Sequence, residues 1–134
     1  MTLKTILVVE DEPHIQRLIQ TNLKRAGYGV RQAMTGSEAL TELEIERPDV
    51  LILDMTLPDI EYYMLLTKLK QNAFTRTVPI IVLSHKPREG EVFRGGGGVD
   101  AYLNKPFNPM DLISFVKRIL GETDGRRLPW VCVF

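Results

Sequence analysis

Five chemically active side chains directly follow, or end, apolar runs of the sequence. Glu10 and Asp11 follow the first run, Asp54 and Ser84 each end a later one, and Lys105 follows the last. A carboxylate at the end of a buried run, such as that of Asp54, costs desolvation free energy unless polar or charged groups offset it. Asp54 is therefore a surface charge, a helix cap, or a reactive group held in a partly buried position.

The types of these side chains favour binding of a divalent cation. Three carboxylates held close together repel one another, and each raises the pKa of the next. A bound cation and the ammonium of Lys105 would relieve this repulsion. Mg²⁺ takes oxygen ligands from one or two carboxylates and completes its shell with water and phosphate oxygens. The residues therefore predict a magnesium site, provided that the fold brings them together.

The apolar runs are typical of buried strands. They are rich in Val, Ile and Leu and lack polar alternation, as expected for parallel strands that are covered on both faces. The segment YGVRQA is a weaker strand and is expected nearer an edge of the sheet. The predicted strands are TILVV (5–9), YGVRQA (28–33), VLIL (50–53), PIIVLS (79–84) and DAYLN (100–104).

Helical patterns alternate with these strands. The first carries the apolar stripe Ile15, Leu18, Ile19, Leu23 and Ala26 at helical spacing. Asp11 is expected to cap this helix, and Gly27 is expected to end it. The second helix opens with a capping-box pattern at residues 35–38. The third is expected to begin near Pro58, and the last to begin after Asn108 as its cap.

The order strand–helix, repeated five times, predicts an α/β fold with a doubly wound, mostly parallel sheet. The sequence contains no internal repeat and no domain linker. In sheets of this kind the working site lies at the carboxyl ends of the strands. The five side chains described first are therefore expected to lie along one edge of the sheet.

Composition excludes several classes of protein. The chain has 134 residues, which fits one compact domain, and its 17 basic residues balance 17 acidic ones. Without a net positive field, nucleic acid binding by this chain alone is not expected. No apolar run reaches the length of a membrane span, no secretory pattern is present, and the single Cys132 forms no internal disulfide. These features favour a cytoplasmic protein.

Four segments of the sequence, VVEDEP, LILDMTLPD, IIVLS and AYLNKPF, resemble the motifs of response-regulator receiver domains of two-component signalling. The resemblance implies a flavodoxin-like (βα)5 fold with strand order 2-1-3-4-5. It covers nearly the whole chain, which implies a receiver domain over residues 1–120. Residues 121–134 are expected to be a C-terminal tail or the stub of a linker.

The resemblance also assigns the residues of the site. It makes Asp54 the phosphoacceptor, and it makes Glu10, Asp11, Asp54 and the backbone carbonyl of Thr56 the protein ligands of Mg²⁺. A carboxylate can take up a phosphoryl group covalently. The transition state carries charge on its equatorial oxygens, which cations stabilise. The implied function is acceptance of a phosphoryl group rather than enzymatic turnover of a substrate, although the domain assists its own phosphorylation and dephosphorylation.

The remaining residues that match the family are those expected to respond to the phosphoryl group. Ser84 matches the hydroxyl residue that turns toward the phosphoryl group, Lys105 the lysine that contacts this group, and Tyr102 the aromatic switch position. The bond between Lys105 and Pro106 is expected to be cis. The implied phosphoryl donor is a histidine kinase or a phosphotransfer protein, and the output partner is an unidentified protein that the domain contacts directly.

The sequence departs from the receiver pattern in three places. Tyr62 stands where a glycine is usual, which predicts backbone strain or a reshaped loop. His85 replaces a small residue after Ser84. The glycine run Gly95–Gly98 predicts a fourth helix that is short, frayed or displaced, since each interior glycine costs about 1 kcal/mol relative to alanine. These departures keep open an alternative function, that of a receiver-like docking module that does not switch.

A flavodoxin-like cofactor binder shares the expected topology but fits less well. It requires a phosphate-cradling loop after the first strand, which is typically built of hydroxyl and glycine residues. The chain has Glu10, Asp11 and Glu12 there, and these acids repel a phosphate unless a metal ion intervenes.

Overall fold

The protein folds around one parallel five-stranded sheet. The computed structural model describes residues 3–84 and 99–122. The strand order is β2-β1-β3-β4-β5, and every neighbouring pair is parallel, as predicted. The strands are β1 (Thr5–Val9), β2 (Gly29–Ala33), β3 (Val50–Asp54), β4 (Ile80–Ser84) and β5 (Ala101–Asn104).

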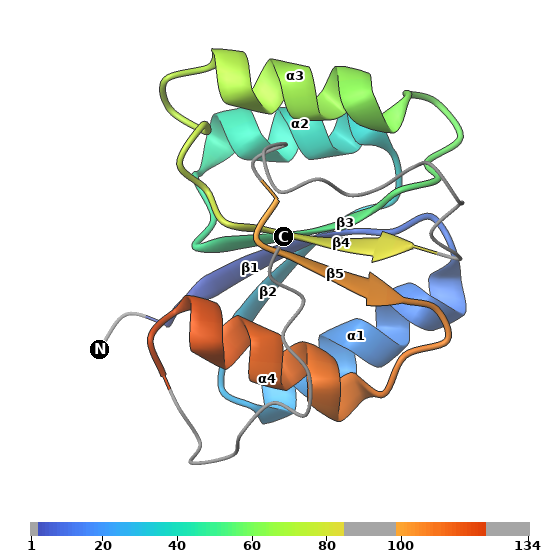
Figure 1. The fold of residues 1–134 in the computed structure, drawn as a ribbon, viewed down its shortest axis with the longest axis vertical. Coiled ribbons are helices and arrows are strands. Elements are labelled where there is room, and N and C mark those ends of the chain that lie inside the picture. The colour runs from blue at the N-terminus through green and yellow to red at the C-terminus, as the bar shows by residue number, and fades with distance from the viewer. Residues whose placement is uncertain (1–2, 85–98, 123–134) are drawn as a thin grey trace.

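Helices cover both faces of the sheet. Figure 1 shows α2 and α3 above the sheet and α1 and α4 below it. The helices of the described ranges are α1 (Pro13–Arg25), α2 (Gly36–Ile45), α3 (Tyr62–Gln71) and α4 (Pro109–Ile119). The arrangement confirms the predicted doubly wound α/β class. The predicted fourth helix with Gly95–Gly98, His85, and the tail beyond residue 122 lie outside the described residues.

The strands are apolar without alternation because each contributes to two cores. Leu7 and Leu53 pack with the residues of α2 and α3, whereas Ile6 and Ile52 pack with those of α1 and α4. Every residue of β3 and β4 is buried. β2 lies at an edge of the sheet and buries only Ala33, which confirms its prediction as the weaker edge strand.

The start of α1 differs from the prediction. The N-cap residue is Glu12, not Asp11: the Glu12 carboxylate accepts hydrogen bonds from the backbone N–H groups of His14 and Ile15, each at 3.1 Å. Asp11 thereby stays available to the edge of the sheet. Within the predicted apolar stripe, Leu18 is 42% exposed.

Three further predicted helix ends agree with the structure. Thr35 caps α2 by accepting from the N–H of Glu38, and Asn108 caps α4 by accepting from the N–H of Met110. Gly27 follows α1 with a φ of 98°, a left-handed conformation that glycine adopts without a steric penalty.

The third predicted helix begins later than expected. α3 starts at Tyr62 rather than near Pro58, and its N-cap residue Glu61 makes no side-chain cap hydrogen bond. No non-glycine residue of the described ranges has a positive φ. Of the two alternatives predicted at Tyr62, backbone strain is therefore wrong: the tyrosine begins a regular helix.

The loop between β3 and α3 is held against the start of α2, which explains the late helix start. The carboxylate of Asp59 accepts hydrogen bonds from the N–H groups of Gly36, at 2.8 Å, and Ser37, at 3.0 Å. A carboxylate at a helix N-terminus is favourable, and the pKa of Asp59 is accordingly lowered by these bonds. A Cβ atom on Gly36 would lie 2.0 Å from Cγ2 of Ile60, so this loop docks closely on α2.

Among the described residues, no helix is both long and apolar enough to cross a membrane.

Candidate functional site

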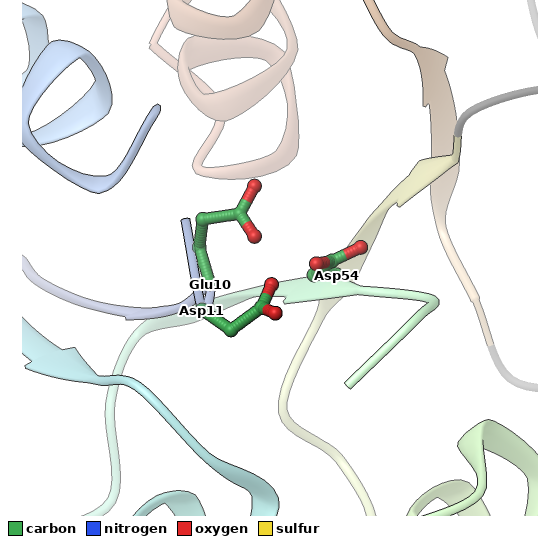
Figure 2. A group of neighbouring side chains, drawn as sticks. All are labelled: Glu10, Asp11 and Asp54. Atoms are coloured by element: carbon green, nitrogen blue, oxygen red, sulfur yellow. The ribbon is translucent and has the colours of Figure 1, made fainter. Parts of the chain in front are cut away.

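Three carboxylates meet at the carboxyl edge of the sheet. Glu10 and Asp11 follow β1, Asp54 ends the neighbouring strand β3, and one oxygen of each lies within 4.8 Å of the others. Figure 2 shows the three side chains directed into the same space. Glu10 and Asp54 are 0% and 1% exposed, whereas Asp11 is exposed. The sheet register thus creates the acidic cluster that the sequence predicted.

Lys105 brings a positive charge to this cluster. Its Nζ contacts Oε1 of Glu10 and lies 3.5 Å from Oδ2 of Asp54. The lysine follows β5, and its backbone N–H donates to the carbonyl of Ser84 on β4. The bond between Lys105 and Pro106 is cis, as expected. Glu10, Asp11, Asp54 and Lys105 therefore lie together, although they are far apart in the sequence.

Two buried polar atoms of the site have no hydrogen-bond partner in the part of the chain that the structure describes. They are Oδ2 of Asp54 and Oγ of Ser84. The other oxygen of Asp54, Oδ1, accepts from the backbone N–H and the hydroxyl of Thr56, at 3.1 and 3.2 Å. A buried polar atom without a partner costs about 1–3 kcal/mol. An exogenous ligand at this edge would remove that cost.

Asp54 is not a helix cap. Its carboxylate bonds to Thr56 inside the loop, and α3 begins well beyond it, so the capping alternative for this residue is wrong. Ser84 lies on the adjacent strand, one residue past Leu83, which pairs with Asp54. The two unpartnered atoms therefore come from neighbouring strand ends.

The two buried carboxyl groups have opposite pKa shifts. Burial, together with Asp54, raises the pKa of Glu10 to about 8, although Lys105 opposes this rise. Burial also pushes the pKa of Asp54 upward, but the neighbouring Glu10 carboxyl, the N–H of Thr56 and the charge of Lys105 outweigh it, and the pKa is lowered. Without a cation, the opposite directions of these shifts favour a proton on Glu10 over a proton on Asp54.

The donor set fits magnesium. Carboxylate oxygens are the ligands that hard divalent cations prefer, whereas zinc sites use mainly histidine and cysteine. A cation near Glu10 and Asp11 would replace the proton on Glu10 and would also offer a partner to Oδ2 of Asp54. The side chains present at the edge of the sheet therefore match the ion that the sequence predicted.

Two features of the site region were not predicted from the sequence. Gln16, a buried amide on α1, donates to backbone carbonyls at the ends of β1 and β2. Tyr62 places its hydroxyl 3.4 Å from that of Tyr102, and both residues are less than a tenth exposed. The only sequence signals were an amide beside the apolar stripe of α1 and a tyrosine where receivers usually carry glycine.

Comparison with known proteins agrees with this geometry. Residues 6–117 match the family described as response regulator receiver domain. The alkaline phosphatase synthesis transcriptional regulatory protein PhoP of Bacillus subtilis is 39% identical over 122 residues, which are 90% of this chain and 50% of that protein. The phosphate regulon transcriptional regulatory protein PhoB of Pseudomonas aeruginosa is 36% identical over 121 residues, or 90% and 53% of the two chains. The chain thus spans about half the length of the curated relatives it matches.

Solved structures share the fold over nearly the whole chain. A response regulator from Chloroflexus aurantiacus has a TM-score of 0.82 at 36% identity and covers 90% of this chain and 100% of its own. The receiver domain of the sensor histidine kinase PA1611 from Pseudomonas aeruginosa has a TM-score of 0.81 at 30% identity, with 90% and 100% covered. That structure has a magnesium ion coordinated in its active site cleft. With its 2-1-3-4-5 sheet and its acidic edge, this chain belongs to the family of response regulator receiver domains.

Proposed function

We propose that this chain accepts a phosphoryl group on Asp54 in a Mg²⁺-dependent reaction and signals through protein contacts. The observation that carries the proposal is Oδ2 of Asp54, a buried carboxylate oxygen that lacks a hydrogen-bond partner among the described residues and lies 3.5 Å from the Lys105 ammonium. The carboxylate oxygen attacks phosphorus, the bond between phosphorus and the donor breaks, and the donor leaves with that electron pair. The product is an aspartyl phosphate.

Lys105 and Ser84 have separate roles in this reaction. The Lys105 ammonium, already beside Asp54, stabilises charge that develops on the phosphoryl oxygens. The hydroxyl of Ser84 is buried and lacks a partner within the described ranges, so it is free to donate to a phosphoryl oxygen once the group has been transferred. The two residues thus bind the product from the carboxyl ends of two different strands, Ser84 as the last residue of β4 and Lys105 directly after β5.

Glu10, Asp11, Asp54 and the backbone carbonyl of Thr56 are the proposed protein ligands of the ion. When bound, Mg²⁺ supplies positive charge to the phosphoryl oxygens and fixes the position of the group. The three carboxylates lie close enough together to share one ion. Thr56 is held beside Asp54 by its own N–H and hydroxyl, which keeps this part of the loop near the acids.

The proposed donor is the phosphohistidine of a histidine kinase or of a phosphotransfer protein, and the proposed location is the cytoplasm. The receiver unit is proposed to comprise residues 1–120, with 121–134 as a tail or linker. The curated relatives are named as transcriptional regulatory proteins of about twice the matched length. The balanced charge of the chain supports the proposal that its output passes through a protein partner, and not through nucleic acid contacts of its own.

Labelling with a small-molecule donor tests the proposal. Acetyl phosphate and Mg²⁺ should add one phosphoryl mass to the wild-type protein, and chelation of the metal should abolish the addition. Asp54→Asn should take up none. Asp59→Asn is the matched control, because Asp59 lies in the same loop but bonds to α2, and it should still be labelled. Equal labelling of Asp54→Asn and wild type would exclude the assignment.

The tyrosine contact favours a second candidate, a receiver-like docking module that does not switch. The hydroxyl of Tyr62 lies 3.4 Å from that of Tyr102, the position expected to respond to phosphorylation. If this contact holds Tyr102 in one place, partner binding becomes independent of the phosphoryl group. Beryllofluoride, an acyl phosphate mimic, separates the two candidates: a large change in affinity for the protein partner on its addition excludes the docking module.

A further inference from the structure

Gln16 of α1 reaches the ends of β1 and β2 with its side-chain amide. Its Nε2 lies 3.1 Å from the carbonyl oxygen of Val8 and 3.2 Å from those of Glu10 and Ala33. The residue is only 3% exposed. An amide nitrogen has two N–H groups, so the three carbonyls share two donors. Gln16 therefore ties two strand ends together at the point where the acidic residues begin.

One of these carbonyls belongs to the peptide group that joins Glu10 to Asp11. Because a peptide group is planar, holding its oxygen restricts the backbone angles on both sides of it. The N–H of Glu10 is also held, since it donates to the carbonyl of Ala33 at 3.0 Å. The backbone of Glu10 is thus held at both ends, which fixes the points from which the side chains of Glu10 and Asp11 leave the chain.

A second amide sets the orientation of Gln16. Gln20, one turn later on α1, donates from its Nε2 to Oε1 of Gln16 at 3.1 Å and also donates to Oε1 of Gln32 on β2. Oε1 of Gln16 is therefore occupied as an acceptor, and its Nε2 faces the carbonyls. The contacts on both ends of the amide exclude the flipped orientation.

We propose that Gln16 is a positioning residue that adapts the acidic cluster to a small divalent cation. The inference rests on the proposed function, because it concerns the same metal site. Mg²⁺ requires near-ideal octahedral geometry at short distances, whereas Ca²⁺ accepts longer distances and irregular shells. Loss of the hydrogen bonds from the Gln16 amide to the three carbonyls lets Glu10 and Asp11 move. This movement weakens Mg²⁺ binding more than Ca²⁺ binding. A general loss of stability would not favour one ion over the other.

Titration of the full chain with each ion tests this role. Gln16→Met keeps the size of the side chain but removes its donors, and Gln71→Met, the same change at an exposed position of α3, is the matched control. Mg²⁺ and Ca²⁺ affinities are read from the NMR shifts of the amides of residues 9–12 and 54–56. In Gln16→Met the Mg²⁺ affinity should fall about tenfold, at the lower end of the usual effect of residues that support metal ligands. The Ca²⁺ affinity should fall much less, and Gln71→Met should keep the wild-type preference.

The outcomes separate this inference from the proposed function. An equal loss of both affinities in Gln16→Met, or no loss, overturns the positioning role while the proposed function stands. A wild-type chain that binds no Mg²⁺ overturns both. If Gln16→Met does not fold, as judged by circular dichroism, the ratio of Mg²⁺ affinity to Ca²⁺ affinity is measured for Gln16→Asn instead. It keeps an amide that is one methylene too short for the three carbonyls, so an unchanged ion preference in that variant also overturns the role.

Discussion

The acidic cluster and the tyrosine pair are two buried polar regions with opposite properties. At the edge of the sheet, Asp54 and Ser84 each have a buried atom without a partner in the described ranges. On the face covered by α2 and α3, the hydroxyls of Tyr62 and Tyr102 lie against each other. The first region is charged, and some of its buried atoms lack hydrogen-bond partners unless a ligand binds. The second region is neutral, and its two hydroxyls are partners for each other.

The electrostatics of the two regions differ in the same way. Burial raises the pKa of both Tyr62 and Tyr102 above the ordinary value, so the pair stays neutral throughout the physiological range. The pKa of Glu10 is instead raised to about 8, so its charge responds to pH and to cations near neutrality. In this protein, buried polar groups thus mark a reactive site only where their hydrogen-bond partners are missing or exchangeable.

The two regions are joined by the loop of residues 55–61, which runs from the end of β3 to the start of α3. Its attachment to α2 through Asp59 holds this connection at one interior point. A substitution where the loop meets α2 therefore tests the connection separately from a substitution in either region.

Lys105→Met should have the largest effect. It removes the ammonium beside Asp54, and loss of one such stabilising group typically costs about 10²–10³ in rate. The rate of labelling by acetyl phosphate should fall accordingly at saturating Mg²⁺. Lys68→Met, which removes an exposed lysine of α3, is the control and should leave the rate unchanged. A labelling rate within twofold of wild type in Lys105→Met would show that the lysine does not stabilise the transition state.

The free energy of unfolding of the metal-free protein should depend on Glu10. Its pKa is raised from 4.5 to about 8 by folding, so the folded state binds more protons than the unfolded state between these values. The contribution of Glu10 to the free energy of unfolding is then fully present below pH 4.5 and is lost as pH rises through about 8. The slope of this loss is up to about 1.4 kcal/mol per pH unit.

Urea unfolding with a chelator, measured across this pH range, checks the dependence. Glu10→Gln should flatten the fall, and Asp111→Asn, at the start of α4, should keep it. Saturating Mg²⁺ should also counteract the fall, because the ion binds the ionised form. A rise in wild-type stability over the same range would contradict the raised pKa.

Gly36→Ala tests the loop that joins the two regions. The added Cβ would lie 2.0 Å from Cγ2 of Ile60, a branched side chain with little freedom to move. Overpacking of this kind typically costs about 1–3 kcal/mol of unfolding free energy. Gly29→Ala is the matched control, since its Cβ would meet its neighbours no closer than 3.7 Å. Equal unfolding midpoints for the two variants would show that the loop is not docked as described.

Tyr62→Phe should have the smallest effect. It removes one hydroxyl of the pair, and a typical hydrogen bond contributes about 0.5–1.5 kcal/mol to the free energy of unfolding. Mg²⁺ affinity should not change, because the Tyr62 hydroxyl contacts Tyr102 and not a carboxylate of the acidic cluster. Tyr63→Phe is the control and should be neutral, since Tyr63 is 61% exposed. A change in Mg²⁺ affinity on Tyr62→Phe would show that the two regions are coupled.

Strand positions and the residues at strand ends were predictable from the sequence. Parallel strands that are covered on both faces leave continuous apolar runs, such as those that precede Glu10 and end on Asp54. Once the strand order is known, the carboxyl ends lie along one edge, and this geometry brings Lys105 to the two acids. The pattern of apolar runs in the sequence suffices here because the strand order of the sheet determines which strand-end residues lie next to one another.

Choices between adjacent residues were not predictable. Asp11 and Glu12 are both reasonable caps for α1, and only the backbone path decides that Glu12 accepts the two N–H groups. The start of α3 depends on Asp59, whose carboxylate bonds to a helix that is distant in sequence. Likewise, Gln16 is buried because its amide donates hydrogen bonds to carbonyls at the strand ends. The spacing of hydrophobic residues in the sequence gives no sign of these bonds.

The most direct test of the central claim is to locate the phosphoryl group chemically. The protein is labelled with acetyl phosphate and Mg²⁺, reduced with borohydride, which converts an aspartyl phosphate to homoserine, and mapped by peptide mass spectrometry. The account predicts homoserine at position 54 and unmodified aspartate at positions 11 and 59. Homoserine at another position, or none under conditions that label a known receiver, would contradict it.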